Sequence, residues 1–142
     1  MTRSDEEIEA LARLVTDCAY HIHRDIGPGL LESAYEIFLA AALTERGPSF
    51  ERQKSIDAVY KGVTVRDAFR VDILVEGKLV VEIKSVERLA PVHRKQMHTY
   101  LGLTGLPLGL LINFGSGLFK DGADRVINPN SDFVGKYKGQ QK

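Results

Sequence analysis

The stretch "VDILVEGKLVVEIKSVERL", residues 71–89, decides the fold that this sequence predicts. Two apolar runs flank Glu76-Gly77, a pattern typical of a β-hairpin. The runs nevertheless carry Asp72, Glu82 and Lys84 at positions inside the predicted strands. Charged side chains are rare beside strongly apolar neighbours unless they have partners or a metal ion. These three side chains therefore need partners or a metal ion in the folded protein.

The apolar residues of the two runs predict how the strands pair. Side chains alternate across a strand, so positions 69, 71, 73 and 75 share one face and positions 79, 81 and 83 share another. The two apolar sets must lie on the same side of the sheet to share one core. Odd positions then pair with odd positions, and even positions pair with even ones. A loop of residues 75–77 satisfies this, pairs 74 with 78 and 72 with 80, and makes Gly77 left-handed. The pattern therefore predicts Asp72, Glu82 and Lys84 on one face.

The rest of the chain predicts a mixed α/β fold. Amphipathic periodicity predicts a first helix up to the Gly-Pro-Gly break at 27–29, and a second from about Leu30 to Arg46. The remaining predicted elements are strands at 50–60, 63–75 and 78–86, a helix at 91–103, a buried parallel strand at 108–114 and a small hairpin at 118–127 around Asp121-Gly122. We expect one domain over residues 1–142, loose at 1–3 and from about 129 onward.

Composition limits the classes of function. The 142 residues are 44% hydrophobic and 27% charged, which is typical of a single globular domain. Nineteen basic residues balance nineteen acidic ones, so a nucleic-acid site would need a local basic patch. The single cysteine, Cys18, excludes an internal disulfide and is expected in the core. No apolar run approaches a membrane span, and we expect a cytoplasmic protein.

Two carboxylates and an ammonium on one sheet face have a chemical use. Hard oxygen ligands held close together bind Mg²⁺ or Mn²⁺, and a neighbouring lysine can hold a water. The alternative is an ion-paired, solvated sheet face without function. Apolar residues on both sides of Asp72 and Glu82 weigh against that alternative.

Several motifs then resemble a known family. Asp72 followed by "VVEIK" is similar to the PD-(D/E)XK nuclease-like superfamily, with Val71 in place of the proline. "GLLESAY" at 29–35 has the form G-x-x-E-x-x-Y, and with "LGLLINFG" it resembles the GxxExxY protein family, a bacterial and archaeal branch. The resemblance implies a restriction-endonuclease-like core of order α-β-β-β-α-β, preceded here by an extra helix. It also implies that Asp72 and Glu82 bind the metal and that Lys84 assists the attacking water.

The resemblance implies further site residues. Glu32 becomes a third metal-binding carboxylate, although acidic residues also favour helix N-termini for electrostatic reasons. Gln96 and Tyr100, four apart on one helix face, would support the site or touch nucleic acid. Arg94 and Lys95 beside them would contact phosphates, unless this is an ordinary solvated helix face. Arg52 and Gln53 could extend the same groove.

The sequence therefore predicts a divalent-metal-dependent nuclease that hydrolyses phosphodiester bonds, with DNA as substrate and Mg²⁺ or Mn²⁺ as cofactor. Two alternatives stay open: a nucleic-acid-binding module that does not cut, and a protein-interaction domain with structural carboxylates. Because the domain offers little surface for a duplex, a homodimer is also plausible.

Overall fold

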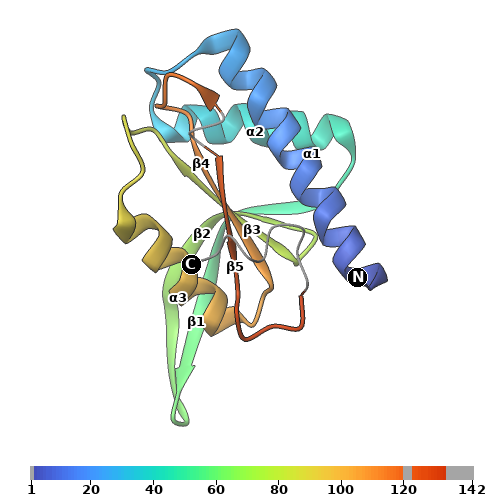
Figure 1. The fold of residues 1–142 in the computed structure, drawn as a ribbon. Coiled ribbons are helices and arrows are strands. Elements are labelled where there is room, and N and C mark those ends of the chain that lie inside the picture. The colour runs from blue at the N-terminus through green and yellow to red at the C-terminus, as the bar shows by residue number, and fades with distance from the viewer. Residues whose placement is uncertain (1, 120–122, 134–142) are drawn as a thin grey trace.

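The computed structural model describes residues 2–119 and 123–133. In chain order its elements are α1 (Arg3–Ile26), α2 (Glu32–Arg46), β1 (Phe50–Tyr60), β2 (Val63–Val75), β3 (Leu79–Lys84), α3 (Pro91–Thr104), β4 (Leu108–Asn113) and β5 (Ala123–Ile127). Within the described residues the strands form one mixed sheet of order β1-β2-β3-β4-β5 (Figure 1). The predicted α/β class and restriction-endonuclease-like core are confirmed.

The helix after β3 makes the central pairing parallel. β3 runs to Lys84, α3 crosses back, and β4 pairs with β3 in parallel from Leu79↔Leu108 to Lys84↔Asn113. All six residues of β4 are buried, as expected for a strand covered on both faces. The other neighbouring strands are antiparallel.

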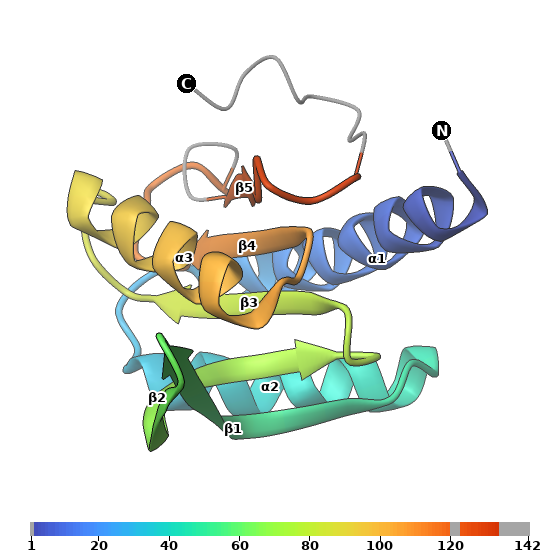
Figure 2. The same cartoon turned by 90° about the horizontal axis from the view of Figure 1, so that it is seen from below.

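Helices cover both faces of the sheet and make two apolar clusters. Figure 2 shows α3 in front of the sheet, with α1 and α2 behind it. The cluster under α1 and α2 includes Val15, Cys18, Leu39, Ile73, Val81 and Ile112. The cluster under α3 includes Leu74, Val80, Met97, Leu101 and Leu111. Even positions of β3, and of β2 from Leu74 onward, thus face α3, which places Glu82 and Lys84 on that side. Val71 and Phe69, at odd positions of β2, also pack in the α3 cluster, so the alternation of faces changes at Asp72.

The predicted pairing of β2 with β3 is right in its even-to-even parity but wrong by two residues. The structure pairs Ile73 with Val81 and Val75 with Leu79, so the loop is 76–78 and not 75–77. Glu76 is left-handed as well as Gly77, with φ of 53° and 64°. The Glu76 backbone N–H donates to the Ser49 carbonyl at 2.9 Å, which fixes the loop one residue further along. The shift brings Asp72 and Glu82 level with each other.

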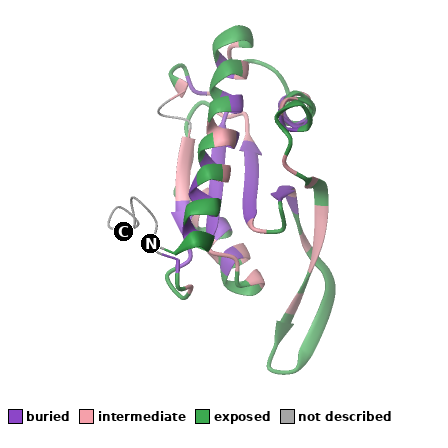
Figure 3. Ribbon diagram, turned by 90° about the vertical axis from the view of Figure 1, so that its right-hand side faces the viewer, coloured by how far each residue is buried: buried purple, intermediate pink, exposed green. Residues whose placement is uncertain are grey.

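Beyond the sheet, β1 and β2 continue as a two-stranded arm. It turns at Lys61 and Gly62, both left-handed, and within the described part of the chain both of its faces are open to solvent (Figure 3). Val59, Tyr60 and Val63 near the tip are 60%, 71% and 64% exposed. At the base of the arm, Phe69 returns to the core.

The C-terminal part differs from the sequence prediction. The hairpin partner of β5 is β4, rather than a strand within 118–127, and the Asp121-Gly122 turn lies outside the described residues. Looseness from about 129 was also expected, yet Phe133 is buried in the larger cluster. Asn128 anchors this stretch, since its side-chain amide donates to the carbonyls of Leu101 and Leu106 at 3.1 Å.

Candidate active site

The site begins where β2 and β3 separate. Their backbone pairing ends at Ile73↔Val81. At the next position the Ile83 N–H donates to Asp72 Oδ2 at 2.7 Å, so the carboxylate of Asp72 takes the place of a strand partner. The backbone of β3 therefore holds one oxygen of Asp72 in a fixed orientation.

Glu82 is an acidic residue buried inside the sheet. Its residue is 5% exposed, and its Oε1 atom is buried without a hydrogen-bond partner among the described residues. Burial, the neighbouring charge of Asp72 and a side-chain hydrogen bond with Asp72 raise the pKa of Glu82 to about 9. The proton that Glu82 retains thus lies beside the carboxylate of Asp72.

Lys84 lies at the end of β3 on the same side as Glu82. Its positive charge lowers the pKa of Glu82 and so opposes the effects of burial and Asp72. The residue is half-buried, and no ion pair involves its ammonium within the described part of the chain. Lys84 therefore keeps its three N–H donors for a ligand beside the carboxylates.

Glu32 lies against the chain just past the end of β3. It begins α2, it is exposed, and its Oε2 accepts the Ser85 N–H at 3.2 Å, one residue past Lys84. The Ser85 hydroxyl also donates to the Leu30 carbonyl at 2.7 Å, so the start of α2 is fastened to the end of β3.

Tyr35 holds the chain just before α2 in place from the core. Its hydroxyl donates to the Gly27 carbonyl at 2.6 Å and accepts the Leu30 N–H at 3.2 Å. Its ring stacks on Phe114, with centroids 4.4 Å apart. The tyrosine of the G-x-x-E-x-x-Y pattern is thus a core residue that also orders the Gly-Pro-Gly turn before Glu32.

The third helix brings Gln96 and Tyr100 to the same site. Tyr100 stacks on Phe69 with ring centroids 4.1 Å apart and hydrogen-bonds Gln96. Burial and the charges of Glu82 and Asp72 raise the pKa of Tyr100, while the hydrogen bond from Gln96 lowers it. The predicted proximity of this helix face to the carboxylates is present in the structure.

The structure adds a residue that the sequence analysis passed over. Glu36 lies one turn after Glu32 on α2, is buried, and accepts Arg52 Nε at 2.9 Å and Gln53 Nε2 at 2.7 Å. Gln53 also donates to Asp72 Oδ1 at 3.3 Å. The four-residue spacing from Glu32 was the available sign that Glu36 shares its helix face.

Arg94, for which a phosphate contact is predicted, is engaged within the protein. Its guanidinium forms an ion pair with Asp124 of β5, and its exposed side-chain fraction is 28%. Lys95 is exposed, and its side chain takes part in no ion pair within residues 2–119 and 123–133. Position 94 faces β5 because α3 packs across the sheet, whereas position 95 faces solvent.

A tight backbone contact supports the end of β3 from behind. Asn113 is fully buried, and its Oδ1 accepts the N–H groups of Val86 and Gly115 at 2.9 and 3.0 Å. A Cβ added to Gly115 would clash with the carbonyl oxygen of Val86 and lie 2.6 Å from its nitrogen. Only glycine fits here, next to Ser85 and Lys84.

We therefore expect Gly115→Ala to destabilise the protein by about 2–3 kcal/mol, as overpacking against backbone does. Chemical denaturation measures the change. Gly117→Ala is the matched control, because an added Cβ there meets nothing within 4 Å. Equal stability of the two variants would contradict the close contact.

The donor set fits a hard divalent cation. Asp72 and Glu82 supply carboxylate oxygens, and the unpartnered Glu82 Oε1 is the kind of atom that a cation satisfies. Within the described residues, no group of three His, Cys, Asp or Glu side chains is already close enough to hold a metal. Asp72 and Glu82 are thus the pair that could hold a cation, whereas Glu32 is held by the Ser85 N–H outside that pair.

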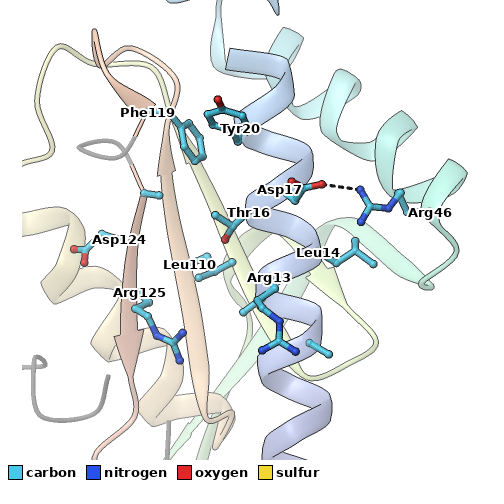
Figure 4. A pocket seen from close by; sticks show the side chains of 13 residues that line it. Arg13, Leu14, Thr16, Asp17, Tyr20, Arg46, Leu110, Phe119, Asp124 and Arg125 are labelled. Carbon is cyan, nitrogen blue, oxygen red and sulfur yellow. Dashed lines mark hydrogen bonds and ion pairs between the residues drawn. The ribbon is translucent and has the colours of Figure 1, made fainter. Parts of the chain in front are cut away.

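A separate pocket of about 950 Å³ lies between α1 and the β4–β5 strands (Figure 4). Arg13, Thr16 and Tyr20 of α1 face Leu110 and Arg125 across it. None of the carboxylates of the site lines this pocket.

Comparison with known proteins agrees with this geometry. A family model of the PD-(D/E)XK nuclease superfamily matches residues 9–126. The chain therefore belongs to the PD-(D/E)XK nuclease superfamily, whose nucleases generally use divalent metals. Searches of curated proteins and of solved structures gave no match. Among the described residues, no helix has the length and apolar character needed to cross a membrane.

Proposed function

We propose that this chain is a divalent-metal-dependent nuclease that hydrolyses phosphodiester bonds in DNA. The observation that carries the proposal is the buried, unpartnered Glu82 Oε1 beside Asp72. A buried carboxylate pair costs stability, and a cation bound by both groups offsets that cost. Family membership makes phosphodiester hydrolysis the chemistry that such a centre supports.

In this proposal Asp72 and Glu82 hold Mg²⁺ or Mn²⁺, and Glu32 completes the ligand set from the rim. The ion would supply Lewis acidity toward phosphate and a lowered pKa for a water molecule. Lys84 donates hydrogen bonds to the attacking water or to the phosphate, because its ammonium is beside Glu82 and has no ion-pair partner within the described residues. Asp72 keeps its orientation through the Ile83 N–H.

The exposed face of α3 is the proposed contact surface for the substrate. Gln96 is exposed and hydrogen-bonded to Tyr100. The Tyr100 side chain is close enough to Glu82 and Asp72 for their charges to raise its pKa. Lys95, next to Gln96, offers an exposed positive charge of the kind that contacts phosphate without reading the base sequence. We also propose that the chain falls in the GxxExxY branch, in which Tyr35 fixes the helix start that carries Glu32.

Two measurements test the function. Isothermal titration with Mn²⁺ asks whether the centre binds metal, and a cleavage screen with Mg²⁺ or Mn²⁺ uses single- and double-stranded DNA and RNA, with EDTA as control. Metal binding and EDTA-sensitive cleavage of DNA support the proposal. Metal and DNA binding without cleavage would indicate a non-cleaving module, and the absence of metal binding would indicate an interaction domain.

The two basic residues of α3 are expected to behave differently in DNA binding. Lys95→Ala removes a phosphate contact, so the slope of log affinity against log salt should become shallower by about 1. Arg94→Ala breaks a half-buried ion pair with Asp124, so it should lower the free energy of unfolding and leave the salt slope unchanged. Fluorescence anisotropy over a range of salt concentrations measures both slopes. A wild-type slope for Lys95→Ala would remove α3 from the binding surface.

A further inference from the structure

We propose that Gln53 is a positioning residue of the metal centre: it ties Asp72 to the buried Glu36 and so fixes the second oxygen of the Asp72 carboxylate. The inference rests on the proposed function, because it concerns the same centre. It assigns to Gln53 and Glu36 a role that is neither metal ligation nor contact with the substrate.

The backbone at Gln53 is the first reason. Gln53 has a φ of 48°, which L residues other than glycine rarely adopt and which costs of order 1–3 kcal/mol. The residue lies inside β1, yet the register is the same on both sides of it, Arg52↔Ile73 and Lys54↔Val71. An inserted residue therefore does not explain the conformation. Strain of this kind persists where the surroundings enforce it, and here the surroundings are two carboxylates.

The side-chain contacts are the second reason. Gln53 Nε2 donates to Glu36 Oε1 at 2.7 Å and to Asp72 Oδ1 at 3.3 Å. Both acceptors are carboxylates, so the amide must present its nitrogen to them. One side-chain NH₂ group has two N–H donors, and each donor is used once.

The anchor is the third reason. Glu36 is buried, and its second oxygen accepts Arg52 Nε at 2.9 Å, so its charge is neutralised on the side away from Asp72. The chain of contacts runs from Arg52 through Glu36 and Gln53 to Asp72, whose other oxygen accepts the Ile83 N–H. Both oxygens of Asp72 are then oriented by the protein. Partners of this kind around metal ligands are worth about 10–100-fold in metal affinity.

Gln53→Gly tests the positioning role through the affinity for Mn²⁺. Glycine adopts the left-handed conformation without strain, which offsets the cost of leaving Glu36 Oε1 without its Gln53 donor, so the melting temperature of the metal-free variant should change little. Its Mn²⁺ affinity should fall at least tenfold. The Ile83 amide, observed by ¹H–¹⁵N NMR in the metal-free protein, should shift and exchange faster. A merely structural Gln53 would lower the melting temperature and leave the Mn²⁺ affinity unchanged, which would overturn the proposal.

Lys61→Gly is the matched control. Lys61 has nearly the same φ, 49°, but lies at the tip of the arm, so its replacement should relieve the same strain with wild-type Mn²⁺ affinity and an unmoved Ile83 amide. Gln53→Asn tolerates the left-handed backbone but is too short to bridge, so it should weaken Mn²⁺ as Gln53→Gly does, and it decides the matter if the glycine variant fails to fold. If the wild type binds no Mn²⁺, the proposed function fails. The chemical shift of the Ile83 amide then tests the positioning role without metal. A shift that occurs in Gln53→Gly but not in Lys61→Gly supports the role, and no shift in Gln53→Gly overturns it.

Discussion

Glu82→Gln is expected to stabilise the metal-free protein at neutral pH and to abolish its metal binding. In the folded protein the pKa of Glu82 is about 9, against an ordinary value of 4.5. The folded state therefore holds a proton that the unfolded state releases, and stability falls as the pH rises from 4.5 to 9. By pH 7 this loss amounts to about 3 kcal/mol. Glutamine has the same shape and no proton to lose, so the variant should keep most of that stability.

Urea denaturation of both proteins at several pH values measures the effect. The difference in unfolding free energy should be small near pH 4.5 and should grow toward pH 8, while Mn²⁺ titration shows no binding to the variant. Glu36→Gln is the matched control. Glu36 is as buried as Glu82, but its carboxylate accepts hydrogen bonds from Arg52 and Gln53. Its neutralisation should destabilise the protein. A loss of several kcal/mol in Glu82→Gln with unchanged Mn²⁺ affinity would instead make Glu82 part of a structural pair.

Lys84→Met should reduce cleavage at least a hundredfold and leave a protein that still binds Mn²⁺ at pH 8. Methionine fills similar space but cannot donate to a water or a phosphate, and a positioned donor or proton-transfer group contributes about 10²–10⁴-fold to rate. Single-turnover cleavage, with Mn²⁺ titration in parallel, separates chemistry from metal affinity. Lys78→Met is the control, because Lys78 forms a surface ion pair with Glu7 and contributes little. Full cleavage by Lys84→Met would assign the activation of water to another group.

The elements that local chemistry governs were predictable from the sequence. Lys61-Gly62 turns β1 into β2 with the predicted bounds, and alternation predicted the even-to-even parity of the β2–β3 pairing. The exact register was not predictable, because it depends on the Ser49 carbonyl, which accepts the Glu76 N–H from a distant part of the chain.

The missed parts of the site are tertiary contacts. Glu36 contacts Gln53 only because α2 lies over β1 at that position. Arg94 looked free because its partner, Asp124, belongs to a strand that joins the sheet thirty positions later. Neither contact leaves a periodic signal in the sequence, since periodicity reports which face is buried and not which residue covers it.

The parallel pairing of β3 with β4 also has a consequence for folding kinetics. β1 and β2 are joined by a two-residue turn and can zip together early, whereas β3 meets β4 only after the chain has closed the loop that contains α3. The Glu32–Ser85 contact joins residues 53 positions apart, so it belongs to the same late stage. We expect mutations at the base of the arm to change the folding rate. Mutations of the carboxylates should change mainly the unfolding rate. The mutual repulsion of Asp72 and Glu82 would then act after the rate-limiting barrier, so the chain can carry a costly centre without folding more slowly.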